Sequence, residues 1–305
     1  MSRHWLESAE RSNILAVRVL VWIALFLGRR VARLVLVPVS FYFLLFGGSA
    51  RAASRDYLSR ATGRRATLRD VFVHFYTFAT VALDRVYFLS DRWSLFDIQL
   101  HGENLLIEQF ERNNGCFLLG AHIGSFESLR TLGRRRAVTV NLVMFEGNAN
   151  RVARVARAVN PDLAHDVIAL GTPESMLRVT EQLDKGAWVG MLADRAISDS
   201  GMVRVPFLGG EAAFPTAPFR IAALTGRPVI LMLGLYSGGN RYELHFETLI
   251  ESAILPRSNR EEVLEQWIRL YASRLEHYCR QAPFNWFNFY AFWASPENKT
   301  DENKT

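Results

Sequence analysis

From residue 96 onward, apolar segments of strand length alternate with longer segments whose apolar residues recur at helical intervals. Strands separated by helical segments favour a parallel sheet, because a parallel connection has to cross over the sheet and usually does so as a helix. Only Val229–Tyr236 and Tyr242–Phe246 are predicted as strands joined directly, across residues 237–240. The chain is therefore predicted to adopt an α/β fold with a mixed, largely parallel sheet flanked by helices.

The remaining elements follow from the same periodicity. Further strands are predicted over Phe96–His101, Cys116–Ala121, Val138–Met144, Asp166–Leu170 and Ala187–Leu192. Helices are predicted over Asp70–Leu89, Glu103–Glu111, Phe126–Leu132, Asn148–Val159, Pro173–Leu183, Ile221–Thr225 and Glu261–Arg280. His74 lies in the apolar stripe of its helix and is predicted as a packed core histidine. The aromatic segment Pro283–Tyr290 is expected to pack on the body or on a membrane surface.

The first seventy residues combine apolar runs with an excess of positive charge. They hold twelve arginines against four acidic residues, whereas the whole chain carries a net charge of only +6. Arginine beside apolar runs suits the anionic cytoplasmic face of a membrane. Because the sequence has no recognisable nucleic-acid-binding module, we expect membrane lipid rather than nucleic acid as a partner.

The two N-terminal apolar runs, Ile14–Leu27 and Leu34–Phe46, are each shorter than the roughly 20 residues that span a bilayer as a helix. Three arrangements stay open: a tilted or interrupted membrane helix with Arg18 at the interface, a helical hairpin within one leaflet, or two buried core helices. A signal peptide is disfavoured, because arginines continue after the apolar region and no small-residue cleavage site follows. Ser49–Arg69 is predicted as an arginine-rich surface helix against lipid headgroups.

These patterns divide the chain into membrane-associated helices over 1–48, an α/β body over 49–294 and a polar tail over 295–305. Cys116 and Cys279 are far apart and predict neither a disulfide framework nor a zinc site, so a reducing, cytoplasm-facing body is expected. His101, His165 and His245 have no carboxylate or cysteine at a spacing that is diagnostic of a metal site. No metal site is therefore predicted.

The stretch Gly115–Glu127 places titratable side chains at the end of a predicted strand. His122 follows the strand, Glu127 stands five residues further on, and Gly124 and Ser125 lie between them. Ligands of open α/β sheets bind at the carboxyl ends of strands. A carboxylate on one imidazole nitrogen fixes the tautomer and leaves the other nitrogen to accept a proton. We therefore predict His122 as a general base and Glu127 as its orienting acid.

A second group of candidate residues, predicted with Gly124 and Ser125 to bind substrate, follows the predicted strand Ala187–Leu192. Asp194 and Arg195 stand at its carboxyl end, and the next segment adds the candidates Arg204, Pro206, Phe207 and Gly209. The alternative to a site role for Asp194 is that it caps a helix or is an ordinary loop carboxylate. For Pro206–Gly210 the alternatives are an ordinary turn and a loop whose backbone amides line a pocket.

Two arginine groups, Arg134–Arg136 and the set Arg151, Arg154 and Arg157, are candidates for docking an acidic carrier protein or phosphates. The second set has the three-residue spacing that places side chains on one helix face. A solvated helix face is the commoner explanation of the same pattern.

Three segments, Gly120–Glu127, Asp194–Gly210 and Pro215–Val229, resemble the lipid A late acyltransferase (lauroyl/myristoyl transferase) family within the lysophospholipid acyltransferase superfamily. The similarity runs over most of the chain. It implies an α/β catalytic body that needs no metal. It also implies transfer of a fatty acyl chain from an acyl carrier protein or coenzyme A thioester to a lipid hydroxyl, at the cytoplasmic side of the bacterial inner membrane.

The resemblance also implies residue roles. It makes His122 and Glu127 the catalytic pair, and it maps the family's aspartate block onto Asp194 and its Pro-Phe-Phe-Gly-like turn onto Pro206–Gly209. Ala121 stands where the family usually has asparagine, which is typical of a divergent branch and leaves the acceptor open.

The expectation is thus an acyltransferase that uses an acyl thioester as co-substrate and no cofactor. Inner-membrane lipids are its expected partners, and acyl carrier protein is a candidate partner. Two alternatives stay open: a thioesterase-like acyl hydrolase, and a non-catalytic membrane-associated lipid-binding protein.

Overall fold

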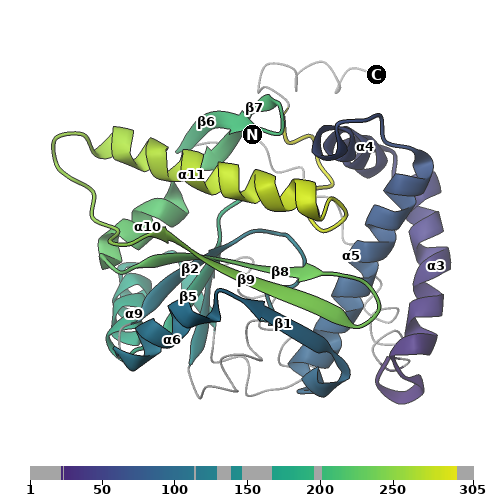
Figure 1. The fold of residues 1–305 in the computed structure, drawn as a ribbon, viewed down its shortest axis with the longest axis horizontal. Coiled ribbons are helices and arrows are strands. Elements are labelled where there is room, and N and C mark those ends of the chain that lie inside the picture. The colour runs from purple at the N-terminus through teal and green to yellow at the C-terminus, as the bar shows by residue number, and fades with distance from the viewer. Residues whose placement is uncertain are drawn as a thin grey trace.

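The computed structural model describes residues 22, 24–112, 115–128, 139–145, 167–195 and 201–293. Within these residues, the main sheet has seven strands in the spatial order β1 (Asp97–His101), β9 (Arg241–Ile250), β8 (Val229–Tyr236), β2 (Cys116–Gly120), β5 (Trp188–Leu192), β3 (Val140–Phe145) and β4 (Val167–Leu170). The β8–β9 hairpin is antiparallel and the other neighbouring pairs are parallel. The predicted mixed, largely parallel α/β fold is confirmed (Figure 1).

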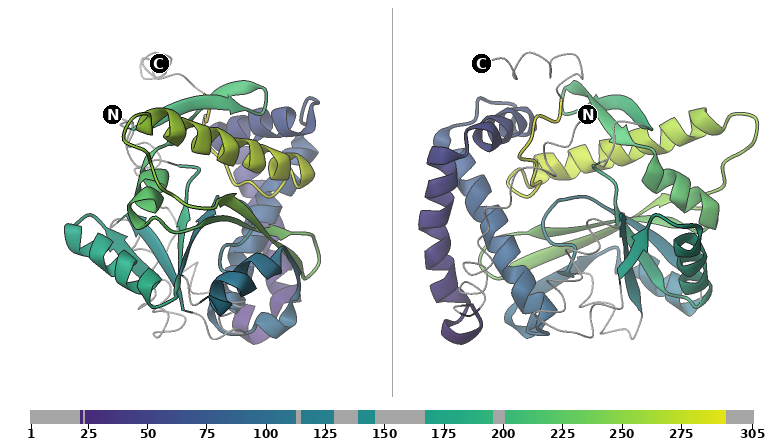
Figure 2. Two further views of the ribbon diagram at one scale, coloured as in Figure 1. Left: turned by 60° about the vertical axis from the view of Figure 1, so that its left-hand side comes forward. Right: turned by 180° about the vertical axis from the view of Figure 1, so that it is seen from behind.

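Helices cover both faces of the sheet (Figure 1; Figure 2). Phe117 and Leu119 of β2 face a core that they share with α9 (Pro173–Asp184), α10 (Ala217–Thr225) and α11 (Arg260–Gln281). Cys116 and Leu118 face the opposite core, which includes α5 (Leu68–Leu89) and α6 (Glu103–Glu111). All five residues of β2 are buried, because side chains alternate between two covered faces.

Most predicted elements agree with the structure to within a few residues, because each has a local signal. Pro173 begins α9, and Gly226 ends α10 with a φ of 63° in the left-handed region. The predicted helices over 126–132 and 148–159, the segment with Arg18 and the tail over 295–305 lie wholly or partly outside the described residues.

A two-stranded hairpin, β6 (Met202–Phe207) and β7 (Gly210–Pro215), was not predicted. Its turn residues Leu208 and Gly209 have φ values of 49° and 74°, which suits the tight turns that join twisted antiparallel strands. The sequence left an ordinary turn and a pocket-lining loop open for residues 206–210. It did not reveal the strands, because Gly201, Pro206, Gly209 and Gly210 are typical of loops.

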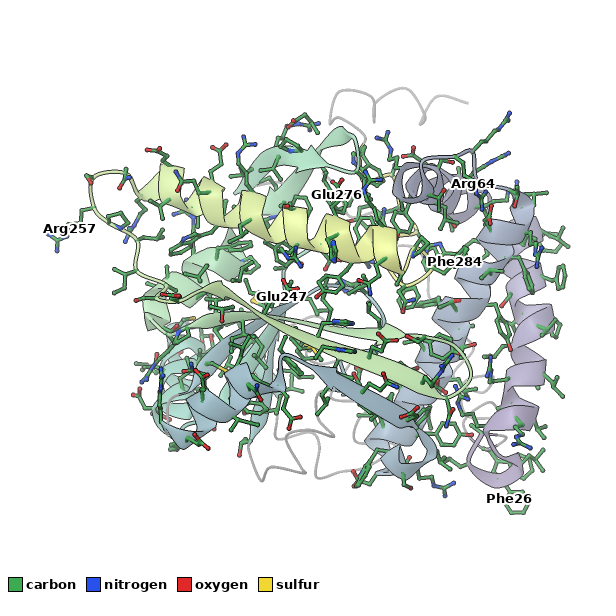
Figure 3. All side chains as sticks on the ribbon, in the orientation of Figure 1. Phe26, Arg64, Glu247, Arg257, Glu276 and Phe284 are labelled. Atoms are coloured by element: carbon green, nitrogen blue, oxygen red, sulfur yellow. The ribbon has the colours of Figure 1, made fainter. Side chains whose placement is uncertain are left out.

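The N-terminal helices α3 (Arg29–Phe46), α4 (Gly48–Thr62) and α5 follow one another, and α3 packs along α5 at one end of the sheet (Figure 1). Only Ala32, Leu36 and Ser40 of α3 are buried. Its other side is apolar and exposed, and Phe26 just before it projects away from the body (Figure 3). The exposed apolar residues of α3 include Leu34, Phe41, Tyr42, Phe43, Leu45 and Phe46. The alternative of a fully buried core helix is therefore wrong for α3.

Among the described helices, no single one is long and apolar enough to cross a bilayer. Helices α3 and α4 together are long and apolar enough, but the pair is bent by 96°. The predicted helix over 49–69 is shorter in the structure, because Gly63 ends α4 with a φ of 67°. A capping box between Thr67 and Asp70 then starts α5. One face of α4 is buried through Tyr57 and Leu58, and its contact with lipid headgroups stays a prediction.

A buried ion pair fastens α3 to α5. The guanidinium of Arg29 donates from Nε and Nη2 to the two carboxylate oxygens of Asp84, at 2.6 and 2.7 Å. The hydroxyl of Tyr242 on β9 donates to the same carboxylate at 2.8 Å. The Asp84 side chain is fully buried, so its charge depends on these partners. The contact joins residues on the two sides of residue 48, where the sequence predicted the boundary between membrane-associated helices and the α/β body.

We predict that Arg29→Ala lowers the free energy of unfolding by about 3–5 kcal/mol, because the change leaves a buried carboxylate without its cation. Thermal and denaturant unfolding of the purified full chain measure the effect. The matched control is Arg30→Ala, which removes an exposed neighbour on the same helix. Equal losses in the two variants would contradict the prediction.

Candidate active site

His122 and Asp194 meet because β2 and β5 pair in parallel register. Gly120 ends β2 opposite Leu192, which ends β5. Each of the two side chains stands two residues beyond its strand, and the backbone N–H of Ala193 still donates to the carbonyl of Gly120 at 3.0 Å. The carboxyl ends of these two strands therefore bring an imidazole and a carboxylate to one edge of the sheet, where α/β folds bind ligands.

The Asp194 carboxylate accepts three hydrogen bonds. His122 donates to it from its backbone N–H at 3.0 Å and from Nδ1 at 2.8 Å, and the Trp286 indole N–H donates at 2.9 Å. Because an ionised carboxylate can only accept, Nδ1 carries the proton in the neutral ring and Nε2 keeps its lone pair. Asp194 is fully buried, while His122 exposes 37% of its side chain. The imidazole is thus held in one tautomer at the surface.

The electrostatics keep Asp194 ionised and His122 neutral. Burial by itself raises the pKa of Asp194, but His122, Arg195 and the Trp286 hydrogen bond together lower that pKa well below its usual range. The pKa of His122 is lowered, first by desolvation of the ring where protein packs around it, then by the positive charges of Arg195 and Arg85, against the opposing effect of Asp194. A neutral imidazole with a free Nε2 is the form that accepts a proton.

The C-terminal segment Asn285–Phe287 holds the backbone around His122. Gly124 N–H donates to the carbonyl of Asn285 at 2.8 Å, and Phe287 N–H donates to the carbonyl of His122 at 2.8 Å. Gly124 has a φ of 55°, and a Cβ there would lie 1.8 Å from the carbonyl oxygen of Gly234. Only glycine fits this crossing, so Gly124 has a backbone role in the site.

Two buried side chains support this segment. The Asn285 amide bonds the backbone of Tyr236, accepting at 2.7 Å and donating at 3.1 Å. His74 lies between the Ser54 hydroxyl at 2.8 Å and the carbonyl of Trp286 at 2.9 Å, and burial lowers its pKa to about 4. The prediction that His74 is a core residue is confirmed, and the aromatic segment packs on the body as expected.

Glu127 lies in a different contact from the one predicted. Its carboxylate forms an ion pair with Arg85 of α5, and the Ser125 hydroxyl donates to it at 3.5 Å. The carboxylate on His122 Nδ1 is that of Asp194. Spacing along the chain pointed to Glu127, whereas strand register selected Asp194. Arg85 is still close enough to lower the pKa of His122, so the Glu127–Arg85 pair borders the site.

Arg195 borders the site from the other strand. Its Nη2 donates to the carbonyl of Phe287, and its guanidinium lies 5.4 Å from the centre of the Tyr290 ring. Its Nε is buried and has no hydrogen-bond partner among the described residues. Ser125 is buried, and its backbone N–H donates to the carbonyl of Gly234 at 2.7 Å. The backbone amides of both Gly124 and Ser125 are therefore already used within the protein.

The hairpin candidates lie further out. Phe207 is buried and its ring is 5.3 Å from that of Trp286, so it supports the indole that bonds Asp194. Arg204, Pro206 and Gly209 are exposed on the hairpin, and Arg204 donates to the carbonyl of Glu211 at 3.2 Å. Pro206–Gly210 therefore combines the end of a strand with a tight turn.

Sequence reasoning missed three site residues, Arg85, Asn285 and Trp286. Arg85 lies on an apolar helix, and its position gave no signal. The segment with Asn285 and Trp286 stood out only as an aromatic cluster with interspersed asparagines.

Some predicted candidates lie outside the described residues: Arg134–Arg136, the set Arg151, Arg154 and Arg157, and His165. Cys116 is buried in β2, and burial raises its thiol pKa.

The described site pairs a neutral, oriented imidazole with a buried carboxylate and flanking arginines, at the carboxyl edge of an α/β sheet. No curated protein matches the sequence significantly. The model of the family described as bacterial lipid A biosynthesis acyltransferase matches residues 11–295. Because this match covers nearly the whole chain, the protein belongs to the bacterial lipid A biosynthesis acyltransferase family and is an enzyme that transfers acyl groups to a lipid acceptor.

Proposed function

We propose that the protein transfers a fatty acyl chain from an acyl carrier protein or coenzyme A thioester to a hydroxyl of a membrane lipid or lipid-like acceptor, with His122 as general base. The observation that carries this proposal is the hydrogen bond between His122 Nδ1 and the buried Asp194 carboxylate, which leaves the Nε2 lone pair of a partly exposed ring to accept a proton. An oriented neutral imidazole is what the attack of a hydroxyl on an acyl group requires.

The reaction then runs in two steps. Nε2 of His122 takes the proton of the acceptor hydroxyl while the hydroxyl oxygen attacks the thioester carbonyl carbon. The resulting tetrahedral intermediate collapses, the carbon–sulfur bond breaks, and the proton on Nε2 passes to the departing thiolate. Asp194 stabilises the imidazolium that exists between these steps, since its charge is opposite and 2.8 Å away.

The negative oxygen of the intermediate needs a donor. Gly124 and Ser125 do not supply it, because their N–H groups already bond protein carbonyls. We assign this role to the positive charges beside His122, Arg195 and Arg85. In this mechanism Glu127 is a positioning residue, because it holds Arg85 near the imidazole.

The acceptor is expected to reach the site from a membrane. The exposed apolar side of α3 is the surface that suits lipid, and α3 is fastened through Asp84 to α5, which carries Arg85 into the site. We place the helices over 1–48 at the bacterial inner membrane and the α/β body over 49–294 on its cytoplasmic side, where acyl thioesters are made. The apolar face and the N-terminal arginines support this placement.

We predict that His122→Ala lowers acyl transfer by about 10²–10⁴-fold while the protein stays folded and membrane-associated. The assay supplies labelled acyl thioester and lipid acceptor to the purified protein and separates acylated lipid from free fatty acid. Turnover retained by His122→Ala would overturn the assignment of the base, and free fatty acid without acylated lipid would identify a hydrolase instead. Lipid analysis of a deletion strain and its complement then identifies the acceptor and the chain length.

We predict that Asp194→Asn acts through His122, whereas Glu127→Gln acts through Arg85. Asp194→Asn should lower kcat strongly, because an amide cannot fix the same tautomer. Glu127→Gln and Arg85→Gln should cause similar losses that do not add in the double variant, since the two side chains form one pair. If Glu127→Gln instead matched His122→Ala while Arg85→Gln had no effect, Glu127 would be the acid that acts on His122.

We predict that kcat/KM falls at low pH with a midpoint below 6.5, because the pKa of His122 is lowered and only its neutral form accepts a proton. Removing a nearby positive charge with Arg195→Gln should raise this midpoint. The control Arg112→Gln, at an exposed position after α6, should leave it in place. A midpoint that does not move in Arg195→Gln would contradict the assigned cause of the shift.

A further inference from the structure

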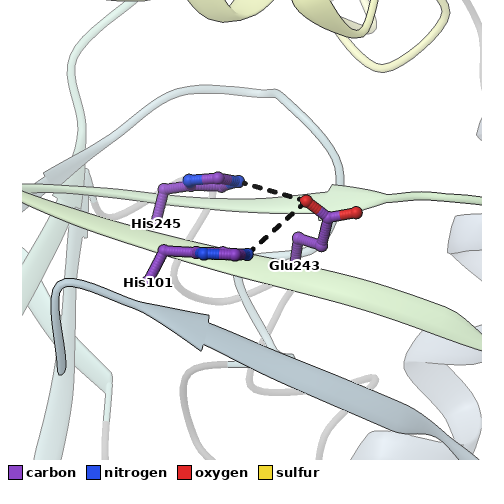
Figure 4. A group of neighbouring side chains, drawn as sticks. All are labelled: His101, Glu243 and His245. Atoms are coloured by element: carbon purple, nitrogen blue, oxygen red, sulfur yellow. Dashed lines mark ion pairs between the residues drawn. The ribbon is translucent and has the colours of Figure 1, made fainter.

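A second cluster of titratable side chains lies on the edge of the sheet, on β1 and β9. Parallel register places His101 of β1 beside His245 of β9, and Gln99 beside Glu243. Because side chains two residues apart share a face of a strand, Glu243 and His245 point the same way. Figure 4 shows both imidazoles directed toward the Glu243 carboxylate.

The donor atoms converge at distances that suit a bridging ion. His101 Nε2 and His245 Nε2 lie 3.6 and 3.7 Å from the same oxygen of Glu243, Oε2. These separations are too long for good hydrogen bonds. Each separation instead suits a pair of atoms that both bind one metal ion at about 2.0–2.2 Å. The three ligand atoms all lie within 4.8 Å of one another.

His245 Nε2 is buried and has no hydrogen-bond partner among the described residues. A buried polar atom without a partner is unfavourable unless something else binds it. The Ser237 hydroxyl meanwhile donates to the other oxygen of Glu243 at 2.7 Å, which orients the carboxylate and leaves Oε2 toward the imidazoles. The rings of His101 and His245 are stacked, with centres 4.5 Å apart and planes inclined by 12°.

We propose that His101, Glu243 and His245 form a binding site for a divalent zinc-like cation, with water in the fourth position. Two imidazoles and one carboxylate are a ligand set that zinc prefers. The side chains of His101 and Glu243 are 47% and 31% exposed, so a hydrated ion can enter. Spacing along the chain did not reveal the complete site, because His101 comes from a strand far from Glu243 and His245 in the sequence.

The surroundings leave these ligands available. Glu247 is the next residue on the same face of β9. It is already paired with Arg274 at 2.6 and 2.7 Å and accepts a hydrogen bond from the Tyr278 hydroxyl. Figure 3 shows Glu247 between β9 and α11. The Tyr278 ring packs 5.0 Å from that of His245. β8 separates β9 from β2, so the cluster is apart from His122. A bound ion would join the edge strand β1 to β9 and have a structural effect.

The test uses the untagged full chain in detergent. Equilibrium dialysis against micromolar Zn²⁺ should give one tightly bound ion per chain, and zinc should raise the unfolding temperature. His101→Ala, His245→Ala and Glu243→Gln should each weaken binding at least tenfold and remove the thermal shift. His277→Ala, which removes an exposed histidine on α11, should change neither, and His122→Ala should also keep zinc binding, whatever its acyl transfer.

A second measurement uses the unaltered protein, so it does not require any variant to fold. Co²⁺ added to the unaltered protein should give the intense visible bands of a tetrahedral site with nitrogen and oxygen ligands. A spectrum of hydrated Co²⁺ alone, absence of stoichiometric zinc, or equal binding by all the variants would overturn the proposal.

Discussion

The parallel register between β2 and β5 is the constraint on which the site depends. It ends two buried strands opposite each other and places His122 and Asp194 two residues beyond them. A shift of one of these strands by one residue would turn that strand's side chains to the other face and separate the imidazole from its carboxylate. The burial of all five residues of β2 between two cores resists such a shift. The packing that fixes the register of the sheet therefore also orients the His122 imidazole.

The C-terminal segment around Trp286 completes the site that the central strands begin. Trp286 is fully buried, with its ring 4.9 Å from Tyr57 and 5.3 Å from Phe207, so α4 and the β6–β7 hairpin both hold it. Its indole N–H supplies a hydrogen bond to Asp194, and the backbone around it bonds His122 and Gly124. The site is thus assembled only when the C-terminal segment has packed against helices from the start of the chain.

Helix α5 connects the apolar N-terminal surface with the site. Two adjacent residues carry the connection: Asp84 binds Arg29 of α3, and Arg85 binds Glu127. A helix that is fastened to a neighbour with an exposed apolar side, and that also positions a charge beside His122, suits an enzyme whose acceptor is a lipid. The zinc-like site proposed on β1 and β9 lies elsewhere in the sheet, so it concerns the stability of the edge and not the transfer itself.

The sequence by itself determined the α/β class, most strands and helices, the core position of His74 and the importance of the strand ends at His122 and Asp194. These inferences rest on periodicity, caps and short segments, which are local along the chain. Only the tertiary structure decided that Asp194 binds His122, that Glu127 binds Arg85, and that His101 meets His245. It also revealed the β6–β7 hairpin and the supporting role of Trp286. The physical reason is that contacts between strands and distant segments depend on register and packing, and spacing along one chain does not encode these directly.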